Sequence, residues 1–171
     1  MMKIKIAKKM LANAVSNVLK AVPGKTTMDI LNNILVSAVG NEIVLIGNDL
    51  ELGISTSVEG EIIEQGKTTL DARLFSEIVR KMPDGDVSIV IDEKGTATVK
   101  CGKSRFSLAT KDADAFPLPP FVEETAQITL SEYSLRDAIN KTLFCINLEE
   151  VTNKMMAALF FQVNGSHLRI T

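Results

Sequence analysis

An internal repeat organises this chain of 171 residues, and its second copy stops before it is complete. The apolar positions of one segment return at a constant offset of 124 residues: Ile4, Leu11, Ala14, Val15 and Leu19 return as Ile128, Leu135, Ala138, Ile139 and Leu143. Residues 42–46 return as residues 167–171 at an offset of 125. Because such self-similarity marks repeated structural units, we predict one complete domain, residues 1–123, and the start of a second, residues 124–171.

Hydrophobic periodicity predicts that the first domain consists of a strand, a helix and further strands, occurring twice. Alternation predicts strands at residues 3–6, 28–38, 42–47, 51–58, 60–64, 68–70, 87–92, 95–100 and 104–110. Helical spacing predicts two apolar seams: Met10, Leu11, Ala14, Val15, Val18 and Leu19, then Leu74, Phe75, Ile78, Val79 and Met82. Pro23 and Pro83 end these helices, and Asp71 is a suitable N-cap for the second. The predicted fold class is α+β, with helices on one face of antiparallel sheets.

The second copy is predicted to follow a stiff, proline-rich connector at residues 116–121. A strand is expected at Ile128–Leu130, with Ser131 as the N-cap of a helix. The seam of that helix contains Leu135, Ala138, Ile139, Thr142 and Leu143. An unfinished copy leaves apolar strands unpaired, so we expect a piece of a longer protein rather than a natural remnant.

Charge is divided unevenly along the chain although the net charge is only −2. Residues 1–28 contain six lysines and no acid, whereas the remaining residues carry a balance of −8. An acidic body with a localised basic surface is consistent with binding to a polyanion. A solvated helix face rich in lysine would give the same pattern.

Composition favours a globular protein of the cytoplasm. With 46% apolar residues the chain can bury a core, and no run reaches the 18 to 20 apolar residues of a membrane span. The N-terminus alternates lysine with isoleucine and does not resemble an export signal. Cys101 and Cys145 form no motif, which suits buried small hydrophobes in a reducing compartment.

No pattern of catalytic or metal-binding residues is present in the sequence. Gly24-Lys25-Thr26 and Gly102-Lys103-Ser104 imitate a phosphate-binding loop, but the preceding glycine that the motif requires is absent. His167 is the single histidine and has no obvious partner. The paired acids, such as Asp84 and Asp86, occur where turns are expected. We therefore predict a binding or scaffolding protein without catalytic residues, metal or cofactor.

Four segments in register identify a resemblance over residues 1–125. They are Asp29-Ile-Leu-Asn-Asn-Ile-Leu35, Ile43-Val-Leu-Ile-Gly-Asn-Asp-Leu-Glu51, Ala72-Arg-Leu-Phe75 before Met82-Pro-Asp-Gly85, and Gly102-Lys-Ser-Arg-Phe-Ser-Leu108 leading to Asp114-Ala-Phe-Pro117. Together they resemble the bacterial sliding clamp, the beta subunit of DNA polymerase III, and the repeat extends the likeness to residue 171.

This resemblance implies an architecture and a set of partners. Clamp chains contain three similar domains, each a twofold-repeated strand-helix-strands unit, and two chains close head to tail into a ring. Helices line the central channel and antiparallel sheets lie outside. The ring would encircle double-stranded DNA without sequence specificity and tether the polymerase catalytic subunit, after loading by the clamp loader. This is the role of a non-enzymatic processivity factor with no membrane partner.

The resemblance also assigns candidate residues. The DNA-facing set is Lys8, Lys9, Lys20, Lys25, Arg73, Arg80, Lys81, Arg136, Lys141, Asn153 and Lys154. Phe106 and Leu108 would lie on an edge strand at the dimer interface, and Met155 would lie at the edge of the pocket for partner peptides.

Each assignment has an ordinary structural alternative. Lys25 would be an exposed turn lysine, Arg73 an i,i+4 partner of Glu77, and Phe106 and Leu108 core residues. For the whole protein, the rival hypotheses are a small-molecule-binding or hydrolytic α+β domain whose site lies beyond residue 171, or an interaction module without DNA contact.

Overall fold

The computed structural model describes residues 1–119, 127–146 and 157–171. The chain folds into two compact units, Met1–Phe121 and Val122–Thr171. No helix among the described residues is long and apolar enough to cross a bilayer.

The first unit contains two similar halves. The first half comprises β1 (Met2–Ala7), α1 (Lys8–Val18), the 3-10 turns η1 (Leu19–Ala21) and η2 (Asp29–Asn32), β2 (Asn33–Val39), β3 (Glu42–Asn48), β4 (Gly53–Val58) and β5 (Glu61–Glu64). The second half comprises β6 (Gly66–Asp71), α2 (Ala72–Lys81), β7 (Asp86–Ile91), β8 (Thr96–Cys101) and β9 (Ser104–Lys111). The strand-helix-strands unit predicted from periodicity is therefore present twice.

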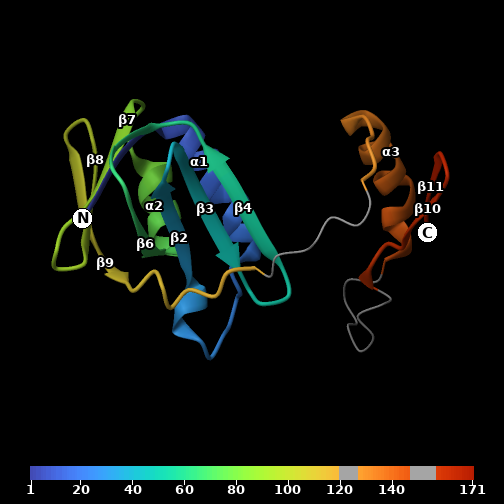
Figure 1. The fold of residues 1–171 in the computed structure, drawn as a ribbon, viewed down its shortest axis with the longest axis horizontal. Helices are drawn as coiled ribbons and strands as arrows, with labels where there is room; N and C mark the ends of the chain where they lie inside the picture. The colour runs from blue at the N-terminus through green and yellow to red at the C-terminus, as the bar shows by residue number, and fades with distance from the viewer. Residues whose placement is uncertain (120–126, 147–156) are drawn as a thin grey trace. The chain divides into compact units, whose positions relative to one another are not determined.

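The described strands of this unit form a nine-stranded sheet in the order β4-β3-β2-β6-β9-β8-β7-β1-β5 (Figure 1). The first strand of each half joins the other half. β1 pairs antiparallel with β7 along Met2–Ala7, and β6 pairs antiparallel with β2 along Gly66–Asp71. The two parts of the sheet meet where β6 and β9 pair over only two positions.

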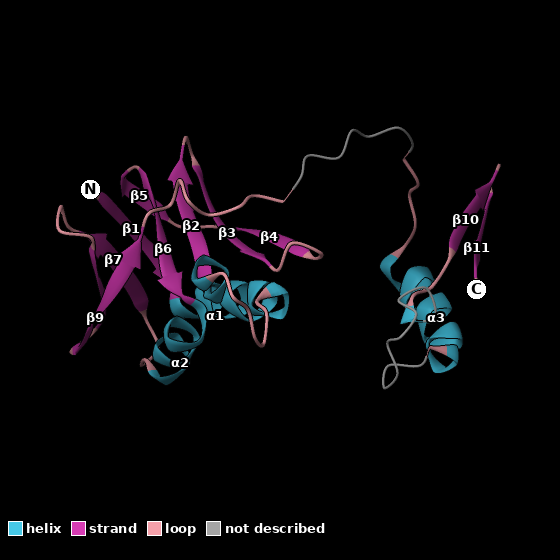
Figure 2. Ribbon diagram, turned by 90° about the horizontal axis from the view of Figure 1, so that it is seen from below, coloured by secondary structure: helices cyan, strands magenta, loops and turns pink. Residues whose placement is uncertain are grey.

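Both helices of the unit lie on the same side of the strands (Figure 2). α1 packs on β3 and β4 and against α2. Alternation along β1 puts Met2, Ile4 and Ile6 in the core and their neighbours in solvent. On the opposite face, Lys5 pairs with Asp86 at 3.0 Å, and the hydrogen bond and charge of this carboxylate raise the pKa of Lys5.

The seams predicted for the two helices are one residue too wide. Leu11, Ala14, Val15 and Val18 are buried on α1, but Met10 is 44% exposed. On α2, Phe75, Ile78, Val79 and the following Met82 are buried, whereas Leu74 is 49% exposed. Both residues lie at the margin of the apolar stripe, where neither the sheet nor the neighbouring helix covers them.

Two strand predictions also need correction. The strand expected over residues 28–38 begins only at Asn33, because residues 29–32 form the turn η2. Strand β4 begins at Gly53 rather than at residue 51, because Asp49 accepts hydrogen bonds from the amides of Glu51 and Leu52 in a turn.

The second unit contains α3 (Glu132–Thr142), the 3-10 turn η3 (Leu143–Cys145) and a hairpin of β10 (Phe161–Asn164) and β11 (His167–Ile170). Ser131 caps α3 as predicted, accepting a hydrogen bond from the amide of Ser134 at 3.1 Å. Ile128–Leu130 is not a strand. Its counterpart β1 is held by β7 and β5 of the first unit, and the described residues of the second unit include no equivalent of these partners.

Replacement of Gly47 by alanine is expected to destabilise the first unit. A Cβ at this position in β3 would lie 2.3 Å from the Val18 carbonyl oxygen, so α1 would have to move off the sheet. We expect the free energy of unfolding to fall by about 1–3 kcal/mol, as measured by denaturant titration. Gly24→Ala is the matched control, because its added Cβ meets no described atom within 4 Å. Equal stability of both variants would contradict this packing.

The N-cap of α2 gives a second test. Asp71 Oδ1 accepts a hydrogen bond from the Leu74 amide at 2.8 Å, so Asp71→Ala should cost about 1 kcal/mol of unfolding free energy. Asp71→Asn retains the acceptor and should recover most of that loss. A similar loss in both variants would mean that the charge, rather than the hydrogen bond, stabilises the helix.

Candidate nucleic-acid interface

The exposed sides of α1, α2 and the turn after α1 carry most of the cations predicted in the first unit. The exposed ones are Lys9, Lys20, Lys25, Arg73, Arg80 and Lys81. They are exposed because the opposite sides of both helices are buried against the sheet. One face of the unit therefore presents ammonium and guanidinium groups from two helices whose first residues, Lys8 and Ala72, are far apart in the sequence.

Arg73 and the turn containing Lys25 are brought together by a long-range hydrogen bond. Arg73 Nη2 donates to the carbonyl oxygen of Gly24, the residue before Lys25, at 3.1 Å. Glu77, the alternative partner of Arg73, instead pairs with Lys81 at 3.6 Å. Arg73 at the start of α2 and Lys25 in the turn after α1 thus form one cationic site.

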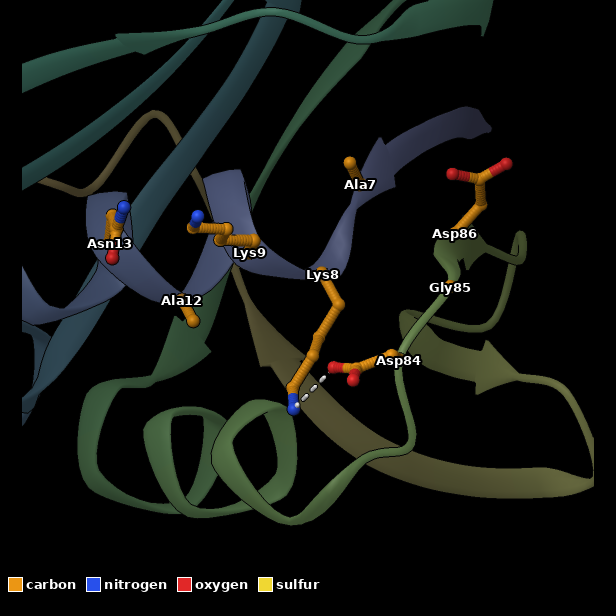
Figure 3. A pocket seen from close by; sticks show the side chains of 8 residues that line it. All are labelled: Ala7, Lys8, Lys9, Ala12, Asn13, Asp84, Gly85 and Asp86. Carbon is orange, nitrogen blue, oxygen red and sulfur yellow. Dashed lines mark hydrogen bonds and ion pairs between the residues drawn. The ribbon is translucent and has the colours of Figure 1, made fainter.

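Lys8 has a different environment from the other predicted cations. Its side chain is 22% exposed, and Nζ lies 3.3 Å from Asp84 Oδ1. Its backbone amide donates to the Gly85 carbonyl at 2.9 Å. These groups line a shallow cavity of about 480 Å³ at the start of α1 (Figure 3). Sequence reasoning missed this role of Asp84, since the pair is separated by 76 residues and carries no local signal.

The predicted cations of the second unit are also paired. Arg136 pairs with Glu132, and Lys141 pairs with Asp137 at 2.7 Å, both one turn apart on α3. Such exposed pairs are weak and exchange readily with other anions. Asn153, Lys154 and Met155 lie outside the described residues.

The strand predicted at the dimer interface has a free edge over part of its length. Residues 104–109 of β9 pair with β8, and only Thr110 and Lys111 pair with β6 on the other side. Phe106 is 39% exposed beside this edge. Leu108 is 5% exposed and belongs to the core, which is the ordinary structural alternative for it, and its place at the dimer interface stays a prediction. The alternation that puts both side chains on one face does not reveal that the core covers only one of them.

Among the acidic residues that stand two apart in the sequence, Asp84 pairs with Lys8 and Asp86 pairs with Lys5. Asp49 and Asp112 accept hydrogen bonds from backbone amides two residues ahead, at 2.9 and 3.0 Å. Cys101 is buried, and Cys145 is exposed. His167 lies on β11, where Nδ1 is 3.3 Å from Ser166 Oγ. Within the described ranges no three His, Cys, Asp or Glu side chains converge as metal ligands would.

Comparison with known proteins gives a consistent result along the chain. The sequence profile of the DNA polymerase III beta subunit, N-terminal domain, matches residues 2–120. The beta sliding clamp of Bacillus subtilis is 34% identical over 178 residues, covering 99% of this chain and 47% of that protein. The beta sliding clamp of Vibrio cholerae is 33% identical over 170 residues, covering 98% and 46%.

Solved structures show the same likeness. The DNA polymerase sliding clamp of Bacillus subtilis superposes with a TM-score of 0.89 at 31% identity, covering 98% of this chain and 46% of that one. The DNA polymerase III beta subunit of Pseudomonas aeruginosa gives 0.89 at 29% identity, covering 99% and 46%. The chain spans about half the length of these relatives. The match to the family's N-terminal domain and the shared fold establish that this chain belongs to the DNA polymerase III beta subunit family, the beta sliding clamps.

Proposed function

We propose that this chain is part of a bacterial sliding clamp, a non-catalytic processivity factor that encircles duplex DNA and tethers the replicative polymerase in the cytoplasm. The observation that carries the proposal is the cationic face of the two helices, with Arg73 held against the turn of Lys25. Membership of the family supports the assignment. We also propose that residues 1–123 are its complete first domain and that residues 124–171 begin its second.

The helix face suits DNA that must be held and still move. Ammonium and guanidinium groups on exposed side chains neutralise phosphates wherever these lie along the duplex, and they read no base edges. The DNA-contacting set in this proposal is Lys9, Lys20, Lys25, Arg73, Arg80, Lys81, Arg136, Lys141, Asn153 and Lys154. Lys8, which was predicted with them, is left out because its ammonium pairs with Asp84. Processivity would come from the closed ring and not from tight binding, because a ring cannot leave a duplex sideways.

The free edge of β9 supports the proposed ring assembly. Unpaired backbone groups along residues 104–109 can accept a strand from another chain and extend the sheet across an interface. Phe106 would add apolar contact at that edge. Polymerase and clamp-loader peptides would bind elsewhere, in a pocket that includes Met155.

The rival hypothesis of a small-molecule or hydrolytic domain predicts buried polar groups that converge on a pocket. The buried polar side chains of the first unit have structural partners instead. Asn33 donates to Thr69, whose hydroxyl also bonds the backbone of Lys111, and Asn48 donates to the Pro117 carbonyl at 2.7 Å. No buried polar side chain within the described part of the chain lacks a partner.

Charge reversal at the cationic site tests the DNA assignment. The double variant Lys25→Glu/Arg73→Glu should lower duplex affinity by about one to two orders of magnitude near 0.1 M salt, equally for unrelated sequences, and reduce the salt slope by about two. Fluorescence anisotropy on the full-length protein measures both quantities. The matched control Lys94→Glu/Lys100→Glu makes the same charge change in the β7–β8 turn and on the outer face of β8. Unchanged binding in the first variant would exclude this face as the DNA surface.

Retention on circular DNA tests encirclement. After loading by a clamp loader, the full-length protein should stay on nicked circular DNA through a high-salt wash and should be lost once the circle is linearised, because a ring slides off an open end. A protein that binds through contacts alone would behave alike on both substrates. Equal retention before and after linearisation would therefore contradict the sliding-clamp proposal.

A further inference from the structure

Each helix of the first unit begins against the turn that follows the other helix. At the start of α1, the Lys8 amide donates to the Gly85 carbonyl in the turn after α2, at 2.9 Å. At the start of α2, Arg73 donates to the Gly24 carbonyl in the segment after α1, at 3.1 Å. At both ends of the helix pair, the start of one helix therefore donates a hydrogen bond to a glycine carbonyl that follows the other helix, in agreement with the twofold repeat of the unit.

The charges at these two ends are opposite. The segment after α1, residues 22–28, contains Lys25 and no acid, whereas the turn after α2, residues 82–86, contains Asp84 and Asp86 and no base. Lys25 therefore adds to the charge of Arg73 at one end. At the other end Asp84 offsets the charge of Lys8, and Asp86 pairs with Lys5.

The local electrostatics explain why a carboxylate is held at the start of α1. The first turn of α1 contains no acid and begins with Lys8 and Lys9, although the partial positive charge of a helix N-terminus favours anions. The Asp84 carboxylate supplies the missing negative charge from a distant turn. Figure 3 shows this carboxylate next to the Lys8 ammonium, while the Lys9 side chain extends along α1 away from it.

We propose that Asp84 weakens duplex binding at the α1 end of the domain, by occupying Lys8 in place of a DNA phosphate. This inference rests on the proposed function, since it assumes that the helix face meets DNA. At one end of the helix pair, the charges of Arg73 and Lys25 are then available to phosphate. At the other end, the charge of Lys8 is neutralised by Asp84. Such partial neutralisation limits the grip of the ring on DNA and so favours sliding.

If the ion pair served only to stabilise the fold, removal of the Asp84 carboxylate would lower the free energy of unfolding and leave the duplex affinity unchanged. The Asp84 side chain is fully exposed, and exposed pairs contribute only about 0–1 kcal/mol to stability. Removing the carboxylate should therefore leave the fold intact and release one cation toward solvent. The variant can be tested in binding assays without loss of the folded protein, and its unfolding curve is the check.

The experiment is a double-variant cycle on the full-length protein, with duplex affinity measured by fluorescence anisotropy from about 50 to 200 mM salt. Asp84→Asn should raise affinity about three- to ten-fold near 0.1 M salt and steepen the salt slope by about one, as expected for one added phosphate contact. Lys8→Ala should change affinity less than about two-fold in the unaltered background and should cancel the gain in the Asp84→Asn background. Asp84→Glu keeps the pair and should match the unaltered protein.

Asp92→Asn is the matched control, because it removes one negative charge from the β7–β8 turn and keeps the oxygen that accepts from the Lys94 and Thr96 amides. An equal gain in Asp92→Asn would overturn the proposal in favour of a general charge effect. No gain in Asp84→Asn, or a loss from Lys8→Ala alone, would also overturn it. If the Lys25/Arg73 reversal still weakens binding, the DNA surface stands and only the role of Asp84 fails; if that reversal also has no effect, the proposed function fails.

Discussion

The exchange of first strands between the two halves is the constraint from which the rest of the first unit follows. β1 lies beside β7, and β6 lies beside β2, so neither half can complete its sheet alone. Each helix follows directly from an exchanged strand and must return across the sheet on the same side as its counterpart. The exchange also places the start of each helix against the turn that ends the other. Both the cationic site and the neutralised site are products of this arrangement.

The same constraint explains the behaviour of the second unit. Ser131 caps α3 and the hairpin β10–β11 pairs, because a cap and a hairpin need only residues close in sequence. Ile128–Leu130 has the same alternation as β1 but remains without a ladder, because its counterpart finds its partners in a distant half. Strand propensity supplies side chains that fit a sheet, whereas the hydrogen bonds must come from another strand.

Electrostatics on the helix face depend on a balance that net charge does not reveal. The chain has a charge of −2, yet the exposed surface of α1, α2 and the turn after α1 carries a net positive charge. Coulombic contacts between exposed groups are screened and individually weak, so many of them can hold a polyanion while each exchanges rapidly. In the proposed role of Asp84, an exposed carboxylate of the protein itself would lower that total at one helix end without altering the fold.

The sequence alone determined the repeat, the positions of most helices and strands, the Asp71 and Ser131 caps and the family, because periodicity and capping depend on neighbouring residues. The sequence could not show that Met10 and Leu74 are exposed while the other residues of their seams are buried. It could not show that Leu108 is buried and Phe106 exposed either. In each case both residues fit the same spacing, and they differ only in whether the core covers them. The partners of the charged groups were decided by tertiary structure. Arg73 meets Gly24, and Lys8 meets Asp84, across 49 and 76 residues of chain, because the exchanged strands bring opposite helix ends together.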